Sequence, residues 1–193
     1  MNDRWGKESY FDYKTSEYQH FLENEGDLPW ENCRGIGLSF GYNQVESEEH
    51  SLSPQSALQL FLDIVSRGGN FLLNVGPTAS GEIPEIQIRV LRGIGDWMKI
   101  NGAAVYGTRA IREILPSSQP WVRWSQKEDS IFAYVDASGD LTFEAPSNIV
   151  DEKSATLIDG RALPIERSGE SISIRIPEQQ LIGPTTIRFT KKK

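Results

Sequence analysis

Two segments with helical periodicity enclose a short apolar segment, and this order limits the possible folds more than any other feature of the sequence. Ser53 and Pro54 predict a helix start, because serine is a favoured N-cap and proline suits the first helical position. Apolar residues then recur at helical spacing until two glycines at residues 68–69. The run NFLLNV (residues 70–75) is typical of a strand covered on both faces. A second helix is predicted over residues 84–102, opened by proline and closed by Asn-Gly.

The segment GIGLSFGYN (residues 35–43) precedes these elements and is predicted to be a buried strand that leads into a loop. It completes the order β-α-β-α, which is the pattern of an α/β fold. Two parallel strands with two helices cannot cover both faces of their own sheet, and the edge of that sheet stays open. We therefore expect this first domain, residues 1–115, to need further structure to complete its sheet.

From about Gln119 the pattern changes to short segments of alternating character, separated by turn signals such as Ser-Gly-Asp at residues 138–140. Strands are predicted over residues 130–135, 141–144, 155–158, 171–176 and 185–189. The fourth of these, SISIRI, alternates strictly, so one face should be buried and the other in contact with water. We expect residues 116–193 to form a second domain, a small antiparallel β-sandwich.

Composition excludes several classes of protein. A hydrophobic content of 38% with 10% aromatic residues is typical of a globular rather than a disordered chain. The net charge of −7 argues against nucleic acid as a partner, and the basic run Lys191–Lys193 is interpreted as a solvated end. No apolar stretch approaches the roughly 20 residues that span a bilayer, and residues 1–4 lack the apolar core of a signal peptide. The single cysteine, Cys33, is expected to be a small apolar side chain.

The N-terminal segment FDYKTSEY (residues 11–18) places the acid Glu17 among aromatic residues, and NDRWG just before it supplies Arg4 and Trp5. A carboxyl group that loses hydration among aromatic rings stays protonated more readily, which is what a general acid for glycoside cleavage requires. A polar, poorly ordered tail is the alternative interpretation of these residues taken alone.

These blocks together resemble the C-terminal part of the α-L-fucosidases of glycoside hydrolase family 29. NDRWG and FDYKTSEY resemble that family's catalytic loop region, and GIGLSFGYN the entry to its seventh barrel strand. Residues 63–85 and 95–108 resemble its last helix-strand-helix. The resemblance implies the C-terminal end of a (β/α)₈-type, TIM-like barrel, followed by an antiparallel β-sandwich. It implies neither a metal nor a cofactor, and no His, Asp or Glu cluster in the sequence has metal-ligand spacing.

The resemblance further implies a retaining exo-glycosidase that acts on terminal α-L-fucosyl groups of glycans or oligosaccharides. Glu17 matches the acid/base of the TSEY block, and Arg4 matches an arginine that reaches the sugar and the nucleophile region. Phe40 matches an aromatic residue that packs near the methyl group of fucose. Trp5 and Tyr42 are candidates for the wall of the same site.

The sequence departs from the family's pattern in one large respect. The family's nucleophilic aspartate, and the histidines and tryptophan that bind the fucose hydroxyls, lie upstream of residues matched by this sequence. His20 and His50 match none of them. Asp3 and Asp12 are the nearest spare carboxylates, but they match structural positions of the loop rather than the nucleophile.

Two interpretations follow from this departure. In one, the chain is a truncated α-L-fucosidase, and self-association supplies the missing surface, with a second copy bringing a carboxylate to Glu17. In the other, it is a non-catalytic remnant that folds with a partner or binds sugar through its sandwich. Trp121 and Trp124 would then be exposed aromatic rings on which a pyranose stacks, although both positions equally suit core packing.

Overall fold

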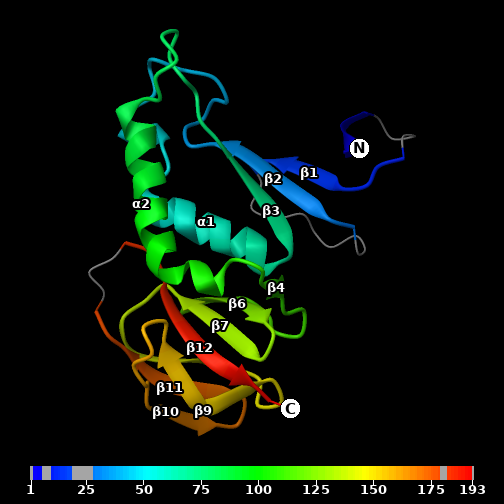
Figure 1. The fold of residues 1–193 in the computed structure, drawn as a ribbon, viewed down its shortest axis with the longest axis vertical. Coiled ribbons are helices and arrows are strands. Elements are labelled where there is room, and N and C mark those ends of the chain that lie inside the picture. Colours follow the sequence, from blue (N-terminus) through cyan, green and yellow to red (C-terminus); the bar gives the residue numbers. More distant parts are fainter. Residues whose placement is uncertain (1, 6–9, 19–27, 179–181, 193) are drawn as a thin grey trace. The chain divides into compact units, whose positions relative to one another are not determined.

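The computed structural model of the chain describes residues 2–5, 10–18, 28–178 and 182–192. Two compact units, Met1–Ile94 and Gly95–Lys193, are described in turn. The first contains parallel strands and helices, and the second contains antiparallel strands (Figure 1). No helix within the described ranges is long and apolar enough to cross a membrane.

The first unit is built on a parallel sheet of three strands in the order β1-β2-β3 (Figure 1). The strands are β1 (Lys14–Glu17), β2 (Trp30–Gly35) and β3 (Gly69–Asn74). Both pairs are parallel, so all three strands run toward the same edge of the sheet. A parallel pair needs a crossover connection, and helix α1 (Pro54–Ser66) supplies it between β2 and β3.

Helix α1 begins where the sequence predicts. The Ser53 hydroxyl accepts a hydrogen bond from the Ser56 amide at 3.1 Å, and the Ser53 amide donates to the Ser56 hydroxyl at 2.9 Å. This reciprocal pair satisfies two backbone amides at the helix start. Gly68 follows the helix with φ at +83°, a conformation that carries no steric penalty for glycine.

Apolar side chains of α1 pack on one face of the sheet in two clusters. The first contains Trp30, Leu60, Ile64 and Phe71, and the second contains Ile36, Ala57, Leu73 and Val90. Val90 belongs to helix α2 (Glu85–Asn101), which therefore packs beside α1 in this unit. Gly93 permits this approach, because an added Cβ would lie 2.5 Å from Cβ of Pro54.

Two sequence-based expectations for the first unit are wrong. Residues 36–43 form a loop, and the strand lies upstream as β2, because pairing of β2 with β3 ends at Gly35 opposite Asn74. Ile36 is fully buried and gives the segment its strand-like pattern, yet its backbone already turns toward the loop, with its carbonyl accepting from the Leu52 amide at 2.8 Å. The sheet also has three strands rather than two, because the polar segment KTSE forms β1.

The second unit contains two antiparallel sheets, as the sequence predicts. One has the strand order β10-β11-β8, and the other has the order β4-β6-β7-β12-β9 with β5 paired to β6. The strands are β4 (Arg109–Ala110), β5 (Ser117–Ser118), β6 (Trp121–Lys127), β7 (Ser130–Val135), β8 (Gly139–Glu144), β9 (Val150–Leu157), β10 (Ile165–Ser168), β11 (Ser171–Ile176) and β12 (Thr185–Lys191). Two predicted strands coincide with β7 and β11, and the other three overlap β8, β9 and β12. Strands β4, β5, β6 and β10 were not expected.

One apolar core joins the two sheets of this sandwich. Along β11 the burial alternates as predicted, with its three isoleucines buried and Ser173 and Arg175 exposed. Trp124 is only 3% exposed, and its ring lies about 6 Å from those of Phe143 and Phe189. Of the two alternatives that the sequence leaves open for Trp124, core packing is therefore confirmed and an exposed sugar platform is excluded.

The boundary between the compact units falls within α2, whereas the sequence places a domain boundary near residue 115. In the second unit the buried Trp97 indole donates to the carbonyl of Pro184 at 2.9 Å. The Tyr134 hydroxyl contacts the carbonyl of Ala104 and lies 2.8 Å from the Ser125 hydroxyl, and burial raises the pKa of Tyr134 well above its ordinary value. These contacts hold the end of α2 against the sandwich. They explain why the boundary between the units lies within α2 and not near residue 115. The assignment of residues 1–115 to one barrel domain stays a prediction.

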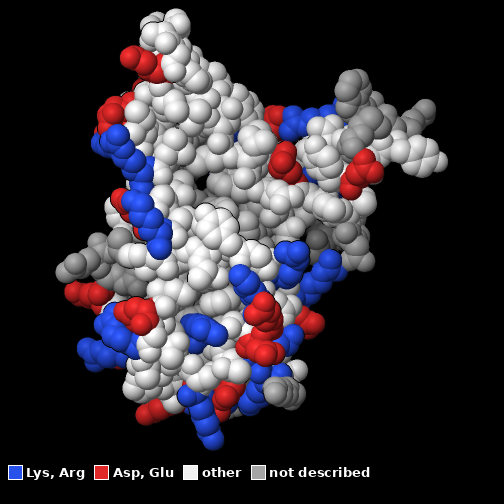
Figure 2. All heavy atoms as spheres, in the orientation of Figure 1, with Lys and Arg blue, Asp and Glu red and all other residues white. Residues whose placement is uncertain are grey.

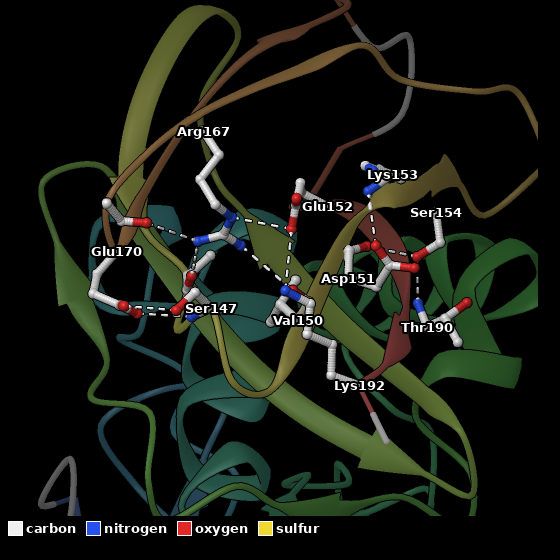
Figure 3. A network of polar contacts seen from close by, with 12 residues as sticks. Ser147, Val150, Asp151, Glu152, Lys153, Ser154, Arg167, Glu170, Thr190 and Lys192 are labelled. Carbon is white, nitrogen blue, oxygen red and sulfur yellow. Dashed lines mark hydrogen bonds and ion pairs between the residues drawn. The ribbon is translucent and has the colours of Figure 1, made fainter.

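Arg167 on β10 links the two sheets of the sandwich (Figure 3). Its Nε donates to Oε2 of Glu152 on β9 at 3.1 Å, and its Nη1 donates to the carbonyls of Ala145 at 2.7 Å and Gly169 at 3.3 Å. Its Nη2 reaches the carbonyl of Val150 at 3.4 Å. The Arg167 and Glu152 side chains are only 15% and 20% exposed, so this pair is well shielded from water.

Two carboxylates of this network are held in their ionised form. A hydrogen bond from its own backbone amide, assisted by Arg167 and opposed by partial burial, keeps the pKa of Glu152 below its ordinary value of 4.5. The Ser147 hydroxyl and amide each donate to Glu170 at 2.7 Å and lower its pKa in the same way. The stabilisation from both groups is present above about pH 4.5 and is lost as the pH falls through their lower folded-state values.

The charged side chains of the sandwich have mixed signs. On the face shown in Figure 2, basic and acidic side chains are interspersed over the lower, β-rich part and do not form one basic patch. This distribution agrees with the net charge of −7 and offers no continuous basic surface on that face for a phosphate backbone.

Replacing Arg167 tests the link between the sheets. We expect Arg167→Gln to lower the free energy of unfolding at pH 7 by about 1–3 kcal/mol, because Glu152 and three carbonyls lose a shielded donor. The matched control is Arg161→Gln, whose pair with Asp159 is 70% and 48% exposed, and which should change stability by less than about 0.5 kcal/mol. Urea denaturation measures both changes.

The pH dependence of the Arg167→Gln effect follows from the sign of the Glu152 pKa shift. As the pH falls from about 4.5 through the lowered folded-state pKa of Glu152, this carboxyl becomes protonated and its ion pair is lost, so the stability gap between wild type and variant should narrow. It should not vanish, because the carbonyl contacts of Arg167 remain. A gap that widens on acidification would contradict this account of the network.

Candidate active site

The carboxyl ends of the three parallel strands meet at one edge of the first unit's sheet. Glu17 ends β1, Gly35 ends β2 and Asn74 ends β3, and Gly35 is paired with Asn74 in the register. Glu17 is paired with Cys33, two residues before the end of β2. Parallel sheets place ligand sites at this edge, because the loops that leave the strands converge there.

Strand register determines which side chains of this sheet share a face. Thr15 and Glu17 are two residues apart on β1, so their side chains leave the same face. Their partners on β2 are Glu31 and Cys33, which share that face because paired residues of neighbouring strands point the same way. Three ionisable groups and a hydroxyl therefore lie together on one side of the sheet.

The opposite face is the one that α1 covers. It carries Ser16 and Asn32, which are both buried and are joined by a hydrogen bond of 2.9 Å from the Asn32 amide to the Ser16 hydroxyl. Asn32 is paired with Phe71, a member of the first α1 cluster. The polar face with Glu17 is thus the face turned away from α1.

Arg4 joins the polar face from the short helix η1 (Asp3–Trp5). Its Nη1 contacts Oε1 of Glu17, and its Nε donates to the Thr15 hydroxyl at 2.9 Å. The Thr15 hydroxyl and amide donate in turn to Oδ1 of Asp3, at 2.7 Å and 3.0 Å. These four residues form a continuous polar chain, in which the Arg4 and Glu17 side chains stay 46% and 43% exposed.

The electrostatic environment of this site shifts the pKa values of two of its groups. The hydrogen bond to Glu17 raises the pKa of Arg4 above its ordinary value, so the guanidinium is always cationic. Burial, with the charge of Glu31 adding to it, raises the pKa of the Cys33 thiol. Glu17 differs from the sequence-based expectation, because it is partly exposed and paired with Arg4 instead of being enclosed by aromatic rings.

A group of aromatic side chains begins one residue beyond Glu17. The Tyr18 ring meets Phe40 edge to face, with centroids 5.3 Å apart and an angle of 63° between the rings. The Arg34 guanidinium lies 5.1 Å from the centroid of the Tyr18 ring, and the Tyr18 hydroxyl accepts from the Gly35 amide at 3.2 Å. Phe40 keeps 37% of its surface exposed, so part of its ring is free to contact a ligand.

The loop that carries Phe40 is fixed by contacts within the first unit. The side-chain amide of Asn74 donates to the Phe40 carbonyl at 2.5 Å, and the Leu38 amide donates to Glu46 at 2.9 Å. Gly76 approaches Gly41 so closely that an added Cβ would lie 2.6 Å and 2.7 Å from its carbonyl carbon and oxygen. The end of β3 therefore sets the position of Phe40.

The structure brings together two of the four predicted site residues, Arg4 and Glu17, and connects Phe40 to them through Tyr18. The side chain of Trp5 lies outside the part of the chain that the structure describes. Tyr42 lies two residues beyond Phe40 and is 50% exposed. The roles of these residues stay predictions.

Of the two histidines, His50 is described and takes no part in this arrangement. His50 accepts from the Ser47 amide through Nδ1 at 3.2 Å, at the short helix η2 (Glu48–His50), and His20 lies outside the described residues. Within the described ranges, no three His, Cys, Asp or Glu side chains are grouped closely enough to hold a metal ion. The described polar groups around Glu17 are carboxylates, the Thr15 hydroxyl, the Cys33 thiol and the Arg4 guanidinium.

Sequence reasoning missed Thr15 and the role of Asp3. The available signal was the spacing Thr-Ser-Glu, which in a strand places the first and third side chains on one face. The contact of Asp3 with Thr15 had no sequence signal, because it depends on η1 folding beside β1 through the bridge between Asn2 and Tyr13. Asp12 is exposed at the approach to β1.

Comparison with known proteins gives one consistent result. A family model described as Alpha-L-fucosidase matches residues 1–103. The chain is 33% identical over 200 residues to the alpha-L-fucosidase of Dictyostelium discoideum, covering 92% of this chain and 41% of that protein. It is 31% identical over 191 residues to the plasma alpha-L-fucosidase of Homo sapiens, covering 92% of this chain and 40% of that protein.

A solved structure of Thermotoga maritima alpha-fucosidase, in complex with a mechanism-based inhibitor, is similar in fold. The TM-score is 0.82 and the identity 32%, with 97% of this chain and 44% of that chain covered. The chain thus spans about two fifths of the length of the curated relatives it matches. The similarity extends over both compact units.

Gly76 offers a test of how the Phe40 loop is held. We expect Gly76→Ala to destabilise the first unit by about 1–3 kcal/mol, because the new Cβ collides with backbone atoms of Gly41 and Tyr42 that cannot move cheaply. Hydrogen exchange of residues 38–45 should become faster. The control is Gly41→Ala, where an added Cβ meets nothing within 4 Å, and similar exchange in both variants would contradict the proposed contact.

Proposed function

The chain belongs to the α-L-fucosidase family, and from this premise we propose that it carries the acid/base part of a retaining exo-glycosidase that removes terminal α-L-fucosyl groups. Its substrates are fucosylated glycans or oligosaccharides. In this proposal residues 1–115 form the C-terminal end of a (β/α)₈-type barrel, and residues 116–193 form the β-sandwich that follows it.

One observation carries the proposal. Glu17 stands at the carboxyl end of a parallel strand, with a guanidinium on its carboxylate and about two fifths of its side chain open to solvent. An acid at this edge has the access to a substrate that proton transfer requires, and barrel enzymes place their catalytic residues there. The family membership supports fucosylated glycans as the substrate class.

The proposed chemistry has two steps. Glu17 first donates a proton to the glycosidic oxygen while a second carboxylate attacks the anomeric carbon and forms a fucosyl-enzyme ester. Glu17 then takes a proton from water as that water attacks the same carbon, which releases fucose with retained configuration and frees the second carboxylate. The residue alternates between a neutral and an ionised form.

Arg4 serves both forms of Glu17. Its positive charge stabilises the carboxylate that acts as base in the second step. In the first step Arg4 has another acceptor, because a hydroxyl oxygen of fucose can take the hydrogen bond that a neutral Glu17 no longer holds as strongly. Partial exposure of both side chains leaves room for that exchange.

The apolar side of the sugar is proposed to lie on Phe40. Fucose has a methyl group where most hexoses have a hydroxymethyl group, and an aromatic edge provides an apolar contact for it. Tyr18, the residue after Glu17, supports the Phe40 ring edge to face. Trp5 and Tyr42 complete the wall of the site in this proposal.

The second carboxylate is proposed to come from outside the described residues. A retaining mechanism needs two carboxyl groups about 5–5.5 Å apart. Asp3 is engaged by two hydrogen bonds from Thr15, which suits a structural role. Either another segment of polypeptide or a second copy of the chain supplies the nucleophile. Light scattering separates the two, since full activity of a stable monomer would exclude the second copy.

Hydrolysis of aryl α-L-fucosides tests the proposal. Glu17→Ala should lower kcat on the order of 10²–10⁴-fold for a phenyl fucoside, whose leaving group needs proton donation. For a dinitrophenyl fucoside, the rate of the first step should fall much less in this variant, because a good leaving group departs without a proton. Added azide should restore turnover of that substrate, by replacing the water that Glu17 would activate.

The control is Glu49→Gln, an exposed acid in η2, which should retain wild-type rates. A folded wild-type chain that binds fucose without hydrolysing it, and whose binding is unchanged in Glu17→Gln, would instead identify a non-catalytic binding remnant. Burial of Trp124 weakens that alternative, because it removes one of the two aromatic rings proposed as a sugar platform.

A further inference from the structure

We propose that Thr15, held by Asp3, is a positioning residue that fixes the Arg4 guanidinium on Glu17. The Arg4–Glu17 contact alone does not fix the position of the guanidinium. The Thr15 hydroxyl, two residues before Glu17 on β1, sets its geometry. The catalytic consequence rests on the proposed function of Glu17, whereas the positioning itself rests only on contacts in the structure.

The direction of the hydrogen bonds is fixed by chemistry. An ionised Asp3 can only accept and a guanidinium can only donate, so the single hydroxyl proton of Thr15 must go to Asp3. The hydroxyl oxygen then presents its lone pairs to Nε of Arg4, at 2.9 Å. The 2.7 Å bond to Asp3 therefore makes the Thr15 oxygen a better acceptor for Arg4.

A single exposed contact would not hold Arg4 in one place. Exposed ion pairs contribute little, because ordering a long side chain costs entropy and water screens the charges. Thr15 and Glu17 leave the same strand face, so one guanidinium can contact both, through Nε and Nη1. Two contact points fix the plane of the guanidinium, which one contact cannot do.

The attachment of η1 to β1 does not depend on the Arg4 side chain. Asp3 also accepts from the Thr15 backbone amide at 3.0 Å, and a parallel bridge between Asn2 and Tyr13 holds η1 beside the approach to β1. Removing the Thr15 hydroxyl would therefore release Arg4 while leaving η1 attached. This separation makes the inference testable.

Thr15 also selects among competing acids. Asp3 adjoins Arg4 in η1, so two carboxylates, those of Asp3 and Glu17, compete for one guanidinium. Cys33, the strand partner of Glu17, and Glu31 lie on the same face of the sheet as Glu17. The Thr15 oxygen occupies Nε and thereby directs Nη1 toward Glu17.

The test compares Thr15→Val with Thr15→Ser. Valine keeps the β-branched shape that suits a strand and removes the hydroxyl, whereas serine keeps the hydroxyl and removes a methyl group. The first measurement is hydrogen exchange of the Arg4 Nε–H by NMR, with its signal assigned through Arg4→Lys. Exchange should be faster on the order of 5–10-fold in the valine variant and near wild type in the serine variant.

The second measurement uses two substrates. With a phenyl α-L-fucoside, Thr15→Val should lose kcat on the order of 10-fold or more, because a misplaced acid/base donates poorly. With a dinitrophenyl fucoside, under single-turnover conditions that report the first step, the loss should stay below roughly threefold, since proton donation is bypassed. Thr15→Ser should stay close to wild type with both substrates.

Each outcome decides the inference. Unchanged Nε–H exchange in a folded Thr15→Val variant would overturn it, and equal losses with both substrates would overturn its catalytic part. Faster exchange with rescue by serine would support the positioning role even if the wild-type chain hydrolyses neither substrate. In that last case the chain has no fucosidase activity on its own, while the inference about Thr15 stands.

Discussion

Parallel pairing of β2 with both of its neighbours is the constraint on which the first unit depends. It brings the carboxyl ends of three strands to one edge, although the segments that follow them are far apart in the sequence. The register of β1 on β2 sets the position of Glu17 in the sheet. The hydrogen bond from Asn74 to the Phe40 carbonyl holds Phe40 at the end of β3. The helices contribute by covering the other face, which leaves the face of Glu17 for polar groups.

Elements with explicit start and stop signals could be predicted from the sequence. Ser53 and the following proline mark α1, and strict alternation marks β11. Strands β1 and β2 could not be predicted, because KTSE and WENCRG carry polar residues on both faces and lack an apolar pattern. Their pairing comes from tertiary context. The segment after β2 resembles a strand because Ile36 is buried in a loop, and burial alone does not distinguish the two.

The site was predictable only where a residue belongs to a local motif. Glu17 and Arg4 stand in short segments that resemble those of the fucosidase family, and the structure joins them. The contact between Asp3 and Thr15 spans twelve positions and requires η1 to fold back along β1, which no local pattern encodes. Trp124 shows the same limit, because a tryptophan in an alternating strand faces either the core or the solvent.

Two Arg–Glu pairs, Arg4–Glu17 in the first unit and Arg167–Glu152 in the second, serve opposite purposes. Arg167 and Glu152 are 15% and 20% exposed, and Arg167 also donates to three backbone carbonyls, so the pair is committed to joining two sheets. Arg4 and Glu17 are 46% and 43% exposed, and among the described residues the Arg4 guanidinium has one further hydrogen-bond partner, the Thr15 hydroxyl. A shielded pair with many partners resists change, whereas an accessible pair with one anchor can exchange a partner for a ligand. That difference in surroundings, more than the residue types, makes the N-terminal pair suited to chemistry and the sandwich pair suited to structure.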